Sequence, residues 1–264
     1  MAHRTAIIGD VHGLLTPLQR LVGRLSLGPA DQLIFVGDLV DKGPAPAETV
    51  DFAASLWESA DYDVVLVEGN HEDRHRRYRR NLTVRPKIAA EQAGSAGELP
   101  GLTAELSERA RAFLDSAVPF LRVEPQGILI VHGGIPGSMD VFPESAEAFA
   151  ALTGKPRQRM SKILRTRFID KDTGDFLAQG KEKPGDPFWA DVYDGRFGHV
   201  VFGHQPFLSG PAEFPHATGI DTGAVHGGTL TALVLDGDAR HYVQVPGIEV
   251  VAPQQPSDYS PAAG

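Results

Sequence analysis

Several apolar segments of this sequence end at a glycine, and carboxylate, imidazole or amide side chains follow directly. In the clearest example, residues 33–36 predict a short buried strand that stops at Gly37, and Asp38 and Asp41 follow it. Buried carboxylates beside a strand end are costly unless a metal ion or another cation neutralises them. The pattern recurs in residues 5–13, 64–72, 128–134 and 200–204. This recurrence predicts one site that is built from several strand ends.

Composition narrows the kinds of protein that could carry such a site. The chain has 264 residues, of which 42% are hydrophobic, so it can bury a full core as one domain. A formal net charge of −9 disfavours non-specific binding to nucleic acid or to an anionic membrane. No apolar run reaches the roughly 18 residues of a transmembrane helix, and the first strand begins too early to leave room for a signal peptide. The absence of cysteine excludes disulfides and thiolate chemistry, and we expect a cytoplasmic enzyme.

The first third of the chain alternates predicted strands and helices. Strands are expected at residues 4–9, 33–37 and 63–69, and amphipathic helices at 14–25 and 45–60. Such βα units favour a partly parallel sheet with helices on its faces. Ligands of these sheets gather beyond the carboxyl ends of the strands, which is where the polar motifs fall.

The rest of the chain is less regular. We expect a helix at 102–120, a strand at 128–131 and an antiparallel end formed by residues 199–203, 218–222, 229–235 and 241–245. Residues 1–250 are predicted to form a single catalytic domain with lid-like segments at about 74–120 and 139–193. Residues 251–264 are predicted to be a disordered tail. Trp189 is expected to anchor the second lid segment by packing, and base stacking on a nucleotide is the less favoured reading.

The polar residues at the strand ends match what a pair of divalent cations needs. Such a site requires a bridging carboxylate and about three further oxygen or nitrogen ligands for each ion. Mixed imidazole, carboxylate and amide donors suit Mn, Fe or Zn. Asp38 is the natural bridge between the ions. The predicted ligands are Asp10, His12, Asp38, Asn70, His132 and His204.

These motifs resemble those of the calcineurin-like metallophosphoesterases. The blocks are Gly-Asp-Val-His-Gly at 9–13, Gly-Asp-Leu-Val-Asp-Lys-Gly at 37–43, Gly-Asn-His-Glu at 69–72, Val-His-Gly-Gly at 131–134 and Val-Phe-Gly-His at 201–204. They occur in the family's order over residues 5–236, and the chain is most similar to the phosphoprotein phosphatase branch. That branch also holds bacterial symmetrical diadenosine-tetraphosphate hydrolases. The resemblance implies an α/β (α+β) fold, a central β-sandwich of mixed sheets flanked by helices, with the antiparallel C-terminal half as the second sheet.

The resemblance also implies a role for each motif residue. One metal would be held by Asp10, His12 and Asp38, and the other by Asp38, Asn70, His132 and His204. The two ions would be manganese, with Fe, Zn, Co or Ni as alternatives. His71 would be the general acid and Asp41 the carboxylate that orients it. A metal-bridging hydroxide would attack phosphorus directly, with no covalent enzyme intermediate.

Lys42 stands where the family usually has arginine, and a lysine lacks the bidentate guanidinium that suits phosphate. We therefore expect the phosphate contacts to come from Lys42 together with Arg165 and Arg167. Glu72 is interpreted as a structural residue, and neither His75 nor His226 is assigned a role. Residues 74–87 carry six arginines and one lysine. They are either a solvated helix face or a basic rim that attracts a polyanion.

Three activities are compatible with these sequence features. The first is a protein or phosphomonoester phosphatase, with a phosphorylated protein or peptide as substrate. The alternative is a symmetrical dinucleoside-polyphosphate hydrolase, for which the segment at 139–193 and the basic residues 74–87 would suit a long anionic substrate. A metal-dependent nuclease ranks lower, because the net charge is acidic and aromatic residues do not alternate with basic ones. We expect neither a membrane contact nor a stable nucleic-acid complex.

Overall fold

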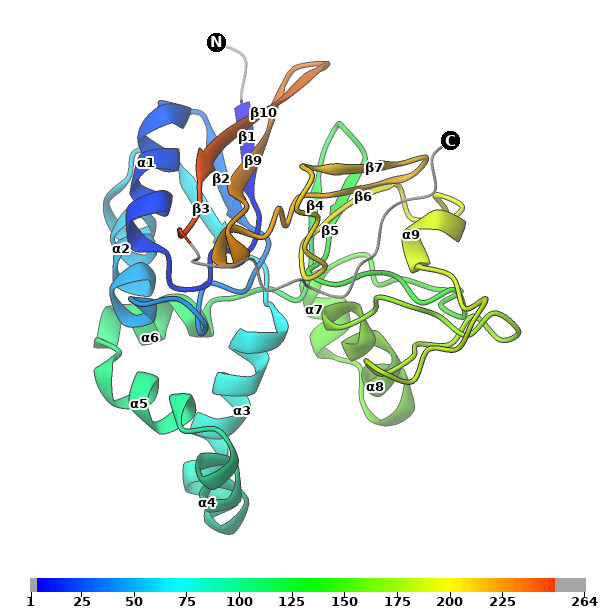
Figure 1. Cartoon of the computed structure of the whole chain (residues 1–264), viewed down its shortest axis with the longest axis horizontal. Helices are drawn as coiled ribbons and strands as arrows, with labels where there is room; N and C mark the ends of the chain where they lie inside the picture. The colour runs from blue at the N-terminus through cyan, green and yellow to red at the C-terminus, as the bar shows by residue number, and fades with distance from the viewer. Residues whose placement is uncertain (1–3, 250–264) are drawn as a thin grey trace.

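The computed structural model describes residues 4–249, which form two five-stranded sheets packed face to face (Figure 1). The contact between the sheets is apolar and includes Ile7, Ile34, Ile130 and Val201. Alternate residues of the same strands, such as Phe35, face outward and are covered by helices. Because both faces of the central strands are buried, their sequences are continuously apolar rather than alternating. The expected sandwich of mixed sheets flanked by helices is confirmed.

The first sheet has the strand order β10-β9-β1-β2-β3. The strands β1 (Arg4–Ile8), β2 (Gln32–Phe35) and β3 (Asp63–Leu66) are parallel, as the βα pattern predicted. The helices α1 (Leu15–Leu25), α2 (Pro46–Ser59) and α6 (Glu108–Asp115) contribute to the core on its outer face. The hairpin of β9 (Thr229–Asp236) and β10 (Ala239–Pro246) pairs antiparallel with β1.

The second sheet has the order β4-β5-β6-β8-β7. Its strands are β4 (Leu121–Val123), β5 (Ile128–Ile130), β6 (His199–Phe202), β7 (Ala212–Phe214) and β8 (Ala217–Gly219). The prediction of an antiparallel C-terminal half was wrong in two respects. The strands β5, β6 and β8 are parallel, because long connections return the chain to the same end of the sheet. The strands β9 and β10 belong to the first sheet, because β9 is apolar on both faces and is buried on both only there.

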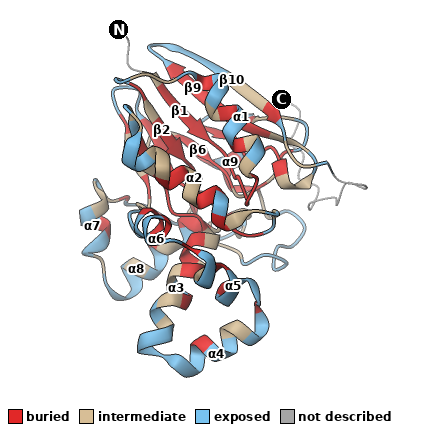
Figure 2. Cartoon of the chain, turned by 90° about the vertical axis from the view of Figure 1, so that its left-hand side faces the viewer, coloured by how far each residue is buried: buried red, intermediate tan, exposed pale blue. Residues whose placement is uncertain are grey.

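Three helices extend from the sandwich beyond the carboxyl end of β3 (Figures 1 and 2). They are α3 (Asn70–Val84), α4 (Pro86–Ser95) and α5 (Glu98–Glu105). The helix expected at 102–120 is instead divided between α5 and α6. The break falls at Ser107, whose hydroxyl oxygen accepts a hydrogen bond from the backbone N–H of Ala110 and so starts a new helix.

The chain between β5 and β6 covers the outer face of the second sheet. It contains α7 (Ala146–Ala150), α8 (Gly154–Met160), the 3₁₀ turn η1 (Ser161–Leu164) and α9 (Trp189–Val192). Trp189 is fully buried, with its ring centroid 4.9 Å from that of Phe202, so it packs as expected. A second 3₁₀ turn, η2 (Ala224–His226), precedes β9.

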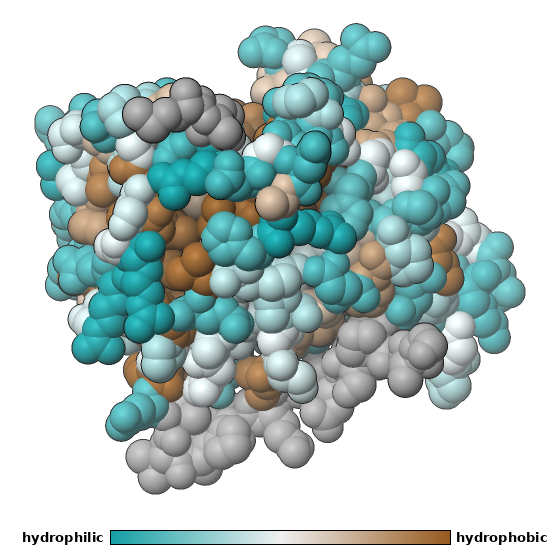
Figure 3. All heavy atoms as spheres, turned by 90° about the horizontal axis from the view of Figure 1, so that it is seen from above, coloured by the Kyte–Doolittle hydropathy of each residue, from teal (hydrophilic) through white to brown (hydrophobic). Residues whose placement is uncertain are grey.

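Within residues 4–249, none of the helices has the length and apolar character needed to cross a bilayer. The face seen from above in Figure 3 mixes hydrophilic and hydrophobic side chains. The predicted tail at 251–264 lies outside the described residues.

Candidate metal centre

The six predicted ligands all follow strand ends that meet at one edge of the sandwich. The first sheet supplies Asp10 and His12 after β1, Asp38 after β2 and Asn70 at the start of α3. The second sheet supplies His132 after β5 and His204 after β6. The parallel direction of these five strands places their carboxyl ends together, and the site therefore straddles both sheets.

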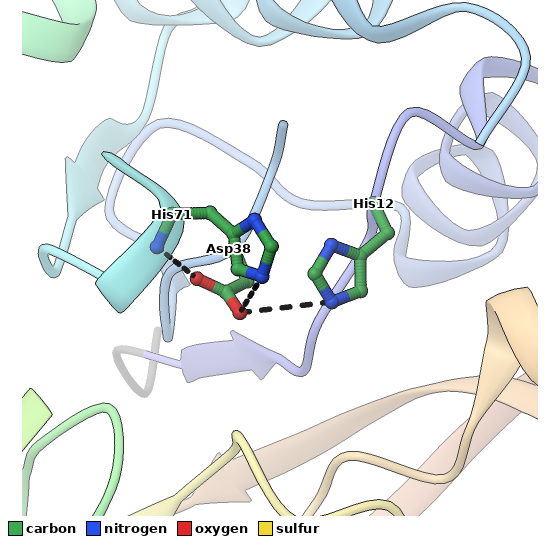
Figure 4. Close-up of side chains that lie close together, drawn as sticks. All are labelled: His12, Asp38 and His71. Atoms are coloured by element: carbon green, nitrogen blue, oxygen red, sulfur yellow. Dashed lines mark hydrogen bonds and ion pairs between the residues drawn. The ribbon is translucent and has the colours of Figure 1, made fainter. Parts of the chain in front are cut away.

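Asp38 lies at the centre of this group. Its Oδ2 atom is 3.6 Å from Nε2 of His12, 3.3 Å from Nε2 of His132 and 3.9 Å from Nε2 of His71. The contacts to His12 and His71 are visible in Figure 4. One carboxylate oxygen thus faces three imidazoles, which is the position that a bridging ligand requires.

The histidine tautomers indicate that a cation belongs between these groups. Nδ1 of His12 contacts the carbonyl of Val40 at 2.9 Å, and Nδ1 of His132 contacts that of Val36 at 3.0 Å. A carbonyl only accepts, so Nδ1 carries the proton, and in a neutral ring the Nε2 lone pair points at Asp38. Burial lowers the pKa of His12 to about 3, so this ring is neutral at pH 7. The Lys42 ammonium lies 2.8 Å from Nε2 of His12 and can satisfy that lone pair. Nε2 of His132 faces the carboxylate of Asp38 and, at 3.1 Å, the amide oxygen of Asn70, and such a cluster of acceptors is favourable only with a cation among them, so the donor set fits metal ions.

The residues divide into two groups that could each hold an ion. His12, Asp38 and His71 offer ligand atoms within 4.8 Å of one another, and so do Asp38, His132 and His204. The amide oxygen of Asn70 joins the second group at 3.1 Å from Nε2 of His132. Asp10 lies beside the first group, with Oδ2 3.9 Å from Nε2 of His12. The structure therefore brings together all six residues that the sequence selected.

The backbone of the site is held in uncommon conformations. His12, Asp38, Asp41, Lys42 and His204 all have φ between 47° and 67°. Non-glycine residues in this left-handed region are uncommon and cluster at functional sites. Three of these five residues, His12, Asp38 and His204, are predicted metal ligands.

Glu72 and two glycines keep the loops of the site in place. The Glu72 carboxylate accepts hydrogen bonds from the backbone N–H groups of Asp38 at 2.7 Å, Leu39 at 2.8 Å and Gly69 at 3.0 Å. A Cβ atom on Gly69 would lie 2.3 Å from Oδ1 of Asp38, and one on Gly203 would lie 2.1 Å from Oδ1 of Asp10. Only glycine leaves room for these carboxylates.

His71 is oriented as the sequence predicted. Its Nδ1 atom lies 2.6 Å from Oδ2 of Asp41, so Nε2 is directed toward Asp38 (Figure 4). Burial acts to lower the pKa of His71, but the carboxylates of Asp38 and Asp41 outweigh burial and raise it. The ring therefore holds a proton more readily than a free histidine does.

The three predicted phosphate-binding residues have different surroundings. Nζ of Lys42 lies 2.8 Å from Nε2 of His12, inside the site. The Arg167 guanidinium donates to the carbonyl oxygen of His204 at 2.7 Å, and its buried Nε atom has no partner among the described residues. Arg165 is instead paired with Asp73 at 2.7 Å and reaches the Asn70 carbonyl at 3.4 Å. Arg167 is thus freer than Arg165 to contact a bound anion.

Two residues of the site were missed by the sequence reasoning. His75 is fully buried, and its Nε2 atom contacts Oδ1 of Asp41 at 2.7 Å. The sequence carried a signal for His75, because it follows His71 by four residues and residues four apart share one face of a helix. Asp221 is buried beside Asp10, and burial raises the pKa of both carboxyl groups, while the charges of Asp221 and Asp38 add to the rise at Asp10. Only the fold brings Asp221 to the site.

Most of the basic side chains of residues 74–87 form ion pairs with nearby carboxylates. Arg74 contacts Glu98, Arg76 contacts Glu68 and Asp73, Arg77 contacts Asp73, and Arg79 contacts Asp115. Of the two readings, this arrangement favours a solvated helix face that ties α3 to its neighbours.

Comparison with known proteins supports the assignment of these motifs to the metallophosphoesterases. The family model of the calcineurin-like phosphoesterases matches residues 3–215. A symmetrical bis(5'-nucleosyl)-tetraphosphatase of Pseudomonas putida is 30% identical, over 90% of this chain and 91% of the relative. An asymmetrical bis(5'-nucleosyl)-tetraphosphatase of Oceanobacillus iheyensis is 29% identical, over 86% of each chain.

Solved structures agree on the fold. The crystal structure of a putative diadenosine tetraphosphatase superimposes with a TM-score of 0.66 at 25% identity, over 94% of this chain and 95% of that one. A serine/threonine phosphatase from Saccharomyces cerevisiae superimposes with a TM-score of 0.63 at 15% identity, covering 94% and 81%, and shows the fold alone. The comparisons support the dinucleoside-polyphosphate alternative better than the protein phosphatase that ranked first on sequence. The chain belongs to the calcineurin-like phosphoesterases and is a metal-dependent phosphoric ester hydrolase.

Proposed function

We propose that this protein hydrolyses dinucleoside tetraphosphates symmetrically, releasing two nucleoside diphosphates. The observation that carries the proposal is the relationship to tetraphosphatases, which extends over about nine-tenths of both chains. Within the chain, the buried mixed-donor centre beside Lys42 and Arg167 is suited to a polyphosphate.

The predicted ligands define where two divalent cations, Mn²⁺ as the leading choice, would bind. Asp10, His12 and Asp38 would hold one ion, and Asp38, Asn70, His132 and His204 would hold the other. When bound, such ions act as Lewis acids toward phosphate oxygens and lower the pKa of water. They also remove the repulsion among the buried carboxylates of Asp10, Asp38 and Asp221.

The remaining chemistry falls to His71, Lys42 and Arg167. Hydrolysis forms a P–O bond from a water oxygen and breaks a phosphoanhydride P–O bond, and the departing oxygen needs positive charge or a proton. His71 donates that proton from Nε2, because Asp41 fixes Nδ1 at 2.6 Å. Arg167 and Lys42 hold the non-bridging oxygens and offset their charge.

The test is a side-by-side assay of the Mn²⁺-loaded protein with diadenosine tetraphosphate and a panel of phosphopeptides, with products resolved by chromatography. Two ADP per substrate are expected, with little phosphate from the peptides. The Asp38→Asn variant is the control, because it removes the central carboxylate and should abolish turnover while the protein stays folded.

Each other result changes the assignment. ATP and AMP as products would mean asymmetrical cleavage, as the name of the Oceanobacillus iheyensis relative describes for that protein. Phosphate released from peptides with the dinucleotide intact would overturn the proposal in favour of a protein phosphatase. Full activity of Asp38→Asn would overturn the metal assignment.

A further inference from the structure

A cavity of about 690 Å³ lies in the segment between β5 and β6, outside the metal centre. Cavities that take small organic ligands measure about 300–1,000 Å³. The roles assigned to the metal-centre residues account for none of the side chains that line it. It therefore requires an explanation of its own.

The cavity has an apolar interior. Pro136, Met139 and Met160 are buried in its wall, and Leu152 and Phe176 are among the other apolar residues that line it. Thioether sulfur atoms make favourable contacts with the edges of aromatic rings. Two methionines beside a phenyl ring therefore suit a flat, polarizable group.

The cavity is also lined by polar groups of both signs, including Asp140, which forms an ion pair with Arg196 at 3.8 Å. Arg159 and Lys162 supply positive charge, and Nζ of Lys162 lies 4.5 Å from the centroid of the Phe176 ring. Asp175 accepts a hydrogen bond from the Ser138 hydroxyl at 2.6 Å, which leaves its second oxygen available as an acceptor. A base with an exocyclic amine, a ribose with hydroxyl groups and an adjacent phosphate would match this combination.

One short segment joins this cavity to the metal centre. The carbonyl of Lys162 accepts hydrogen bonds from the backbone N–H groups of Arg165 and Thr166 at 2.9 and 3.0 Å. Arg165 and Arg167 then reach the backbone carbonyls of Asn70 and His204. The N–H group of Gly133, next to His132, donates to the Ile163 carbonyl at 2.7 Å. The same turn thus forms a wall of the cavity and borders the metal ligands.

Chain geometry limits the distance between residues that border the two sites. Lys162 precedes Arg165 by three residues and Pro136 follows His132 by four, so these Cα pairs are at most about 11 and 14 Å apart. Symmetrical cleavage of a tetraphosphate leaves two phosphates and a ribose between the broken bond and each base. That linker can span a gap of this size.

We propose that this cavity is a nucleoside subsite that holds the purine base and ribose of one end of the dinucleoside polyphosphate. The inference rests on the proposed function and names what that function would need beyond phosphate chemistry. It predicts that affinity depends on the nucleoside as well as on the phosphates.

The test uses ADP and pyrophosphate as paired probes, with binding to the Mn²⁺-loaded protein measured by calorimetry. Wild type should bind ADP more tightly than pyrophosphate. Ala148→Trp fills the cavity from α7, so the Kd for ADP should rise about tenfold or more, as lost base stacking typically costs. The Kd for pyrophosphate should stay unchanged.

Ala150→Trp is the matched control, because Ala150 is also exposed on α7 but does not line the cavity. Equal ADP affinities for wild type and both variants would overturn the subsite, as would a wild type that binds ADP no more tightly than pyrophosphate. Equal loss of both probes would also overturn it, because the substitution would then disturb the metal centre. Failure to cleave diadenosine tetraphosphate would instead refute the proposed function, whatever the binding result.

Discussion

Nε2 of His75 lies 2.7 Å from Oδ1 of Asp41, and the other carboxylate oxygen of Asp41 holds His71. Both rings come from α3, one helical turn apart, so a single carboxylate is fixed from two directions. His75 is fully buried and belongs to neither of the two groups of candidate ligands. We propose from this contact that His75 positions His71, the predicted proton donor, through Asp41.

Replacing His75 tests this role. His75→Leu removes the donor to Asp41, and kcat should fall about tenfold or more, as when the partner of a catalytic group is lost. His75→Gln keeps an N–H donor and should recover much of the rate. Steady-state kinetics on diadenosine tetraphosphate, with thermal melting to confirm folding, gives the comparison. Equal rates for the leucine variant and wild type would show that Asp41 needs no second support.

His71→Ala separates proton donation from metal binding. The variant should lose about 10²-fold or more in kcat on substrates with poor leaving groups such as alkyl phosphates. The loss on nitrophenyl phosphate should be much smaller, because that leaving group departs without a proton. Equal losses on the two substrates would contradict the role of His71 as the acid.

Local sequence alone predicts where several of the candidate ligands lie. Asp10, Asp38 and Asn70 follow apolar segments that end at glycine, so local sequence alone shows that they sit at strand ends. Parallel βα units then bring those ends to one edge, whatever lies elsewhere in the chain. Local sequence therefore places these three residues without knowledge of the second sheet, which supplies His132 and His204.

The features that could not be predicted from the sequence depend on long-range contacts. The strands β5, β7 and β8 are three residues each, too short for their composition to indicate direction. Arg165 and Arg167 look equivalent in sequence, but Arg165 forms an ion pair with Asp73 on α3, whereas Arg167 donates to the backbone carbonyl of His204. Asp221 becomes part of the site only because β8 runs beside β6.

Chelation should reduce the stability of the protein as well as its activity. Bound cations offset the repulsion among Asp10, Asp38 and Asp221, so adding Mn²⁺ at about 100 times its Kd should raise the free energy of unfolding by about 2.7 kcal/mol. Denaturant titrations with and without EDTA measure this difference. The Asp38→Asn variant should show a much smaller response to Mn²⁺, and an unchanged response would contradict the ligand assignment.

Glu72 should be necessary for folding of the Asp38 loop. In Glu72→Gln an NH₂ group replaces one of the two carboxylate oxygens. A backbone N–H group then faces another donor instead of an acceptor. We expect a loss of about 1–3 kcal/mol in unfolding free energy. Turnover should fall as well, because Asp38 depends on this loop. Glu91→Gln on the exposed side of α4 is the control, and comparable effects in both variants would refute the structural role.

A buried carboxylate beside the start of β1, far from the metal centre, stabilises the fold. The Asp31 carboxylate accepts hydrogen bonds from the Arg4 guanidinium and from the backbone N–H groups of Arg4 and Gly28. Burial of Asp31 acts to raise its pKa, but these donors outweigh burial and hold the pKa below its ordinary value of 3.8. The ionised form is therefore favoured more in the folded than in the unfolded protein.

The sign of the pH dependence follows from this order of pKa values. The stabilisation from Asp31 is fully present above the unfolded pKa and is lost as the pH falls through the folded pKa. Asp31→Asn should therefore cost about 1–3 kcal/mol in unfolding free energy at neutral pH. Urea titrations of both proteins at decreasing pH should show the difference shrinking only below about pH 4. A difference that is constant across this range would mean that Asp31 acts through packing and not through its charge.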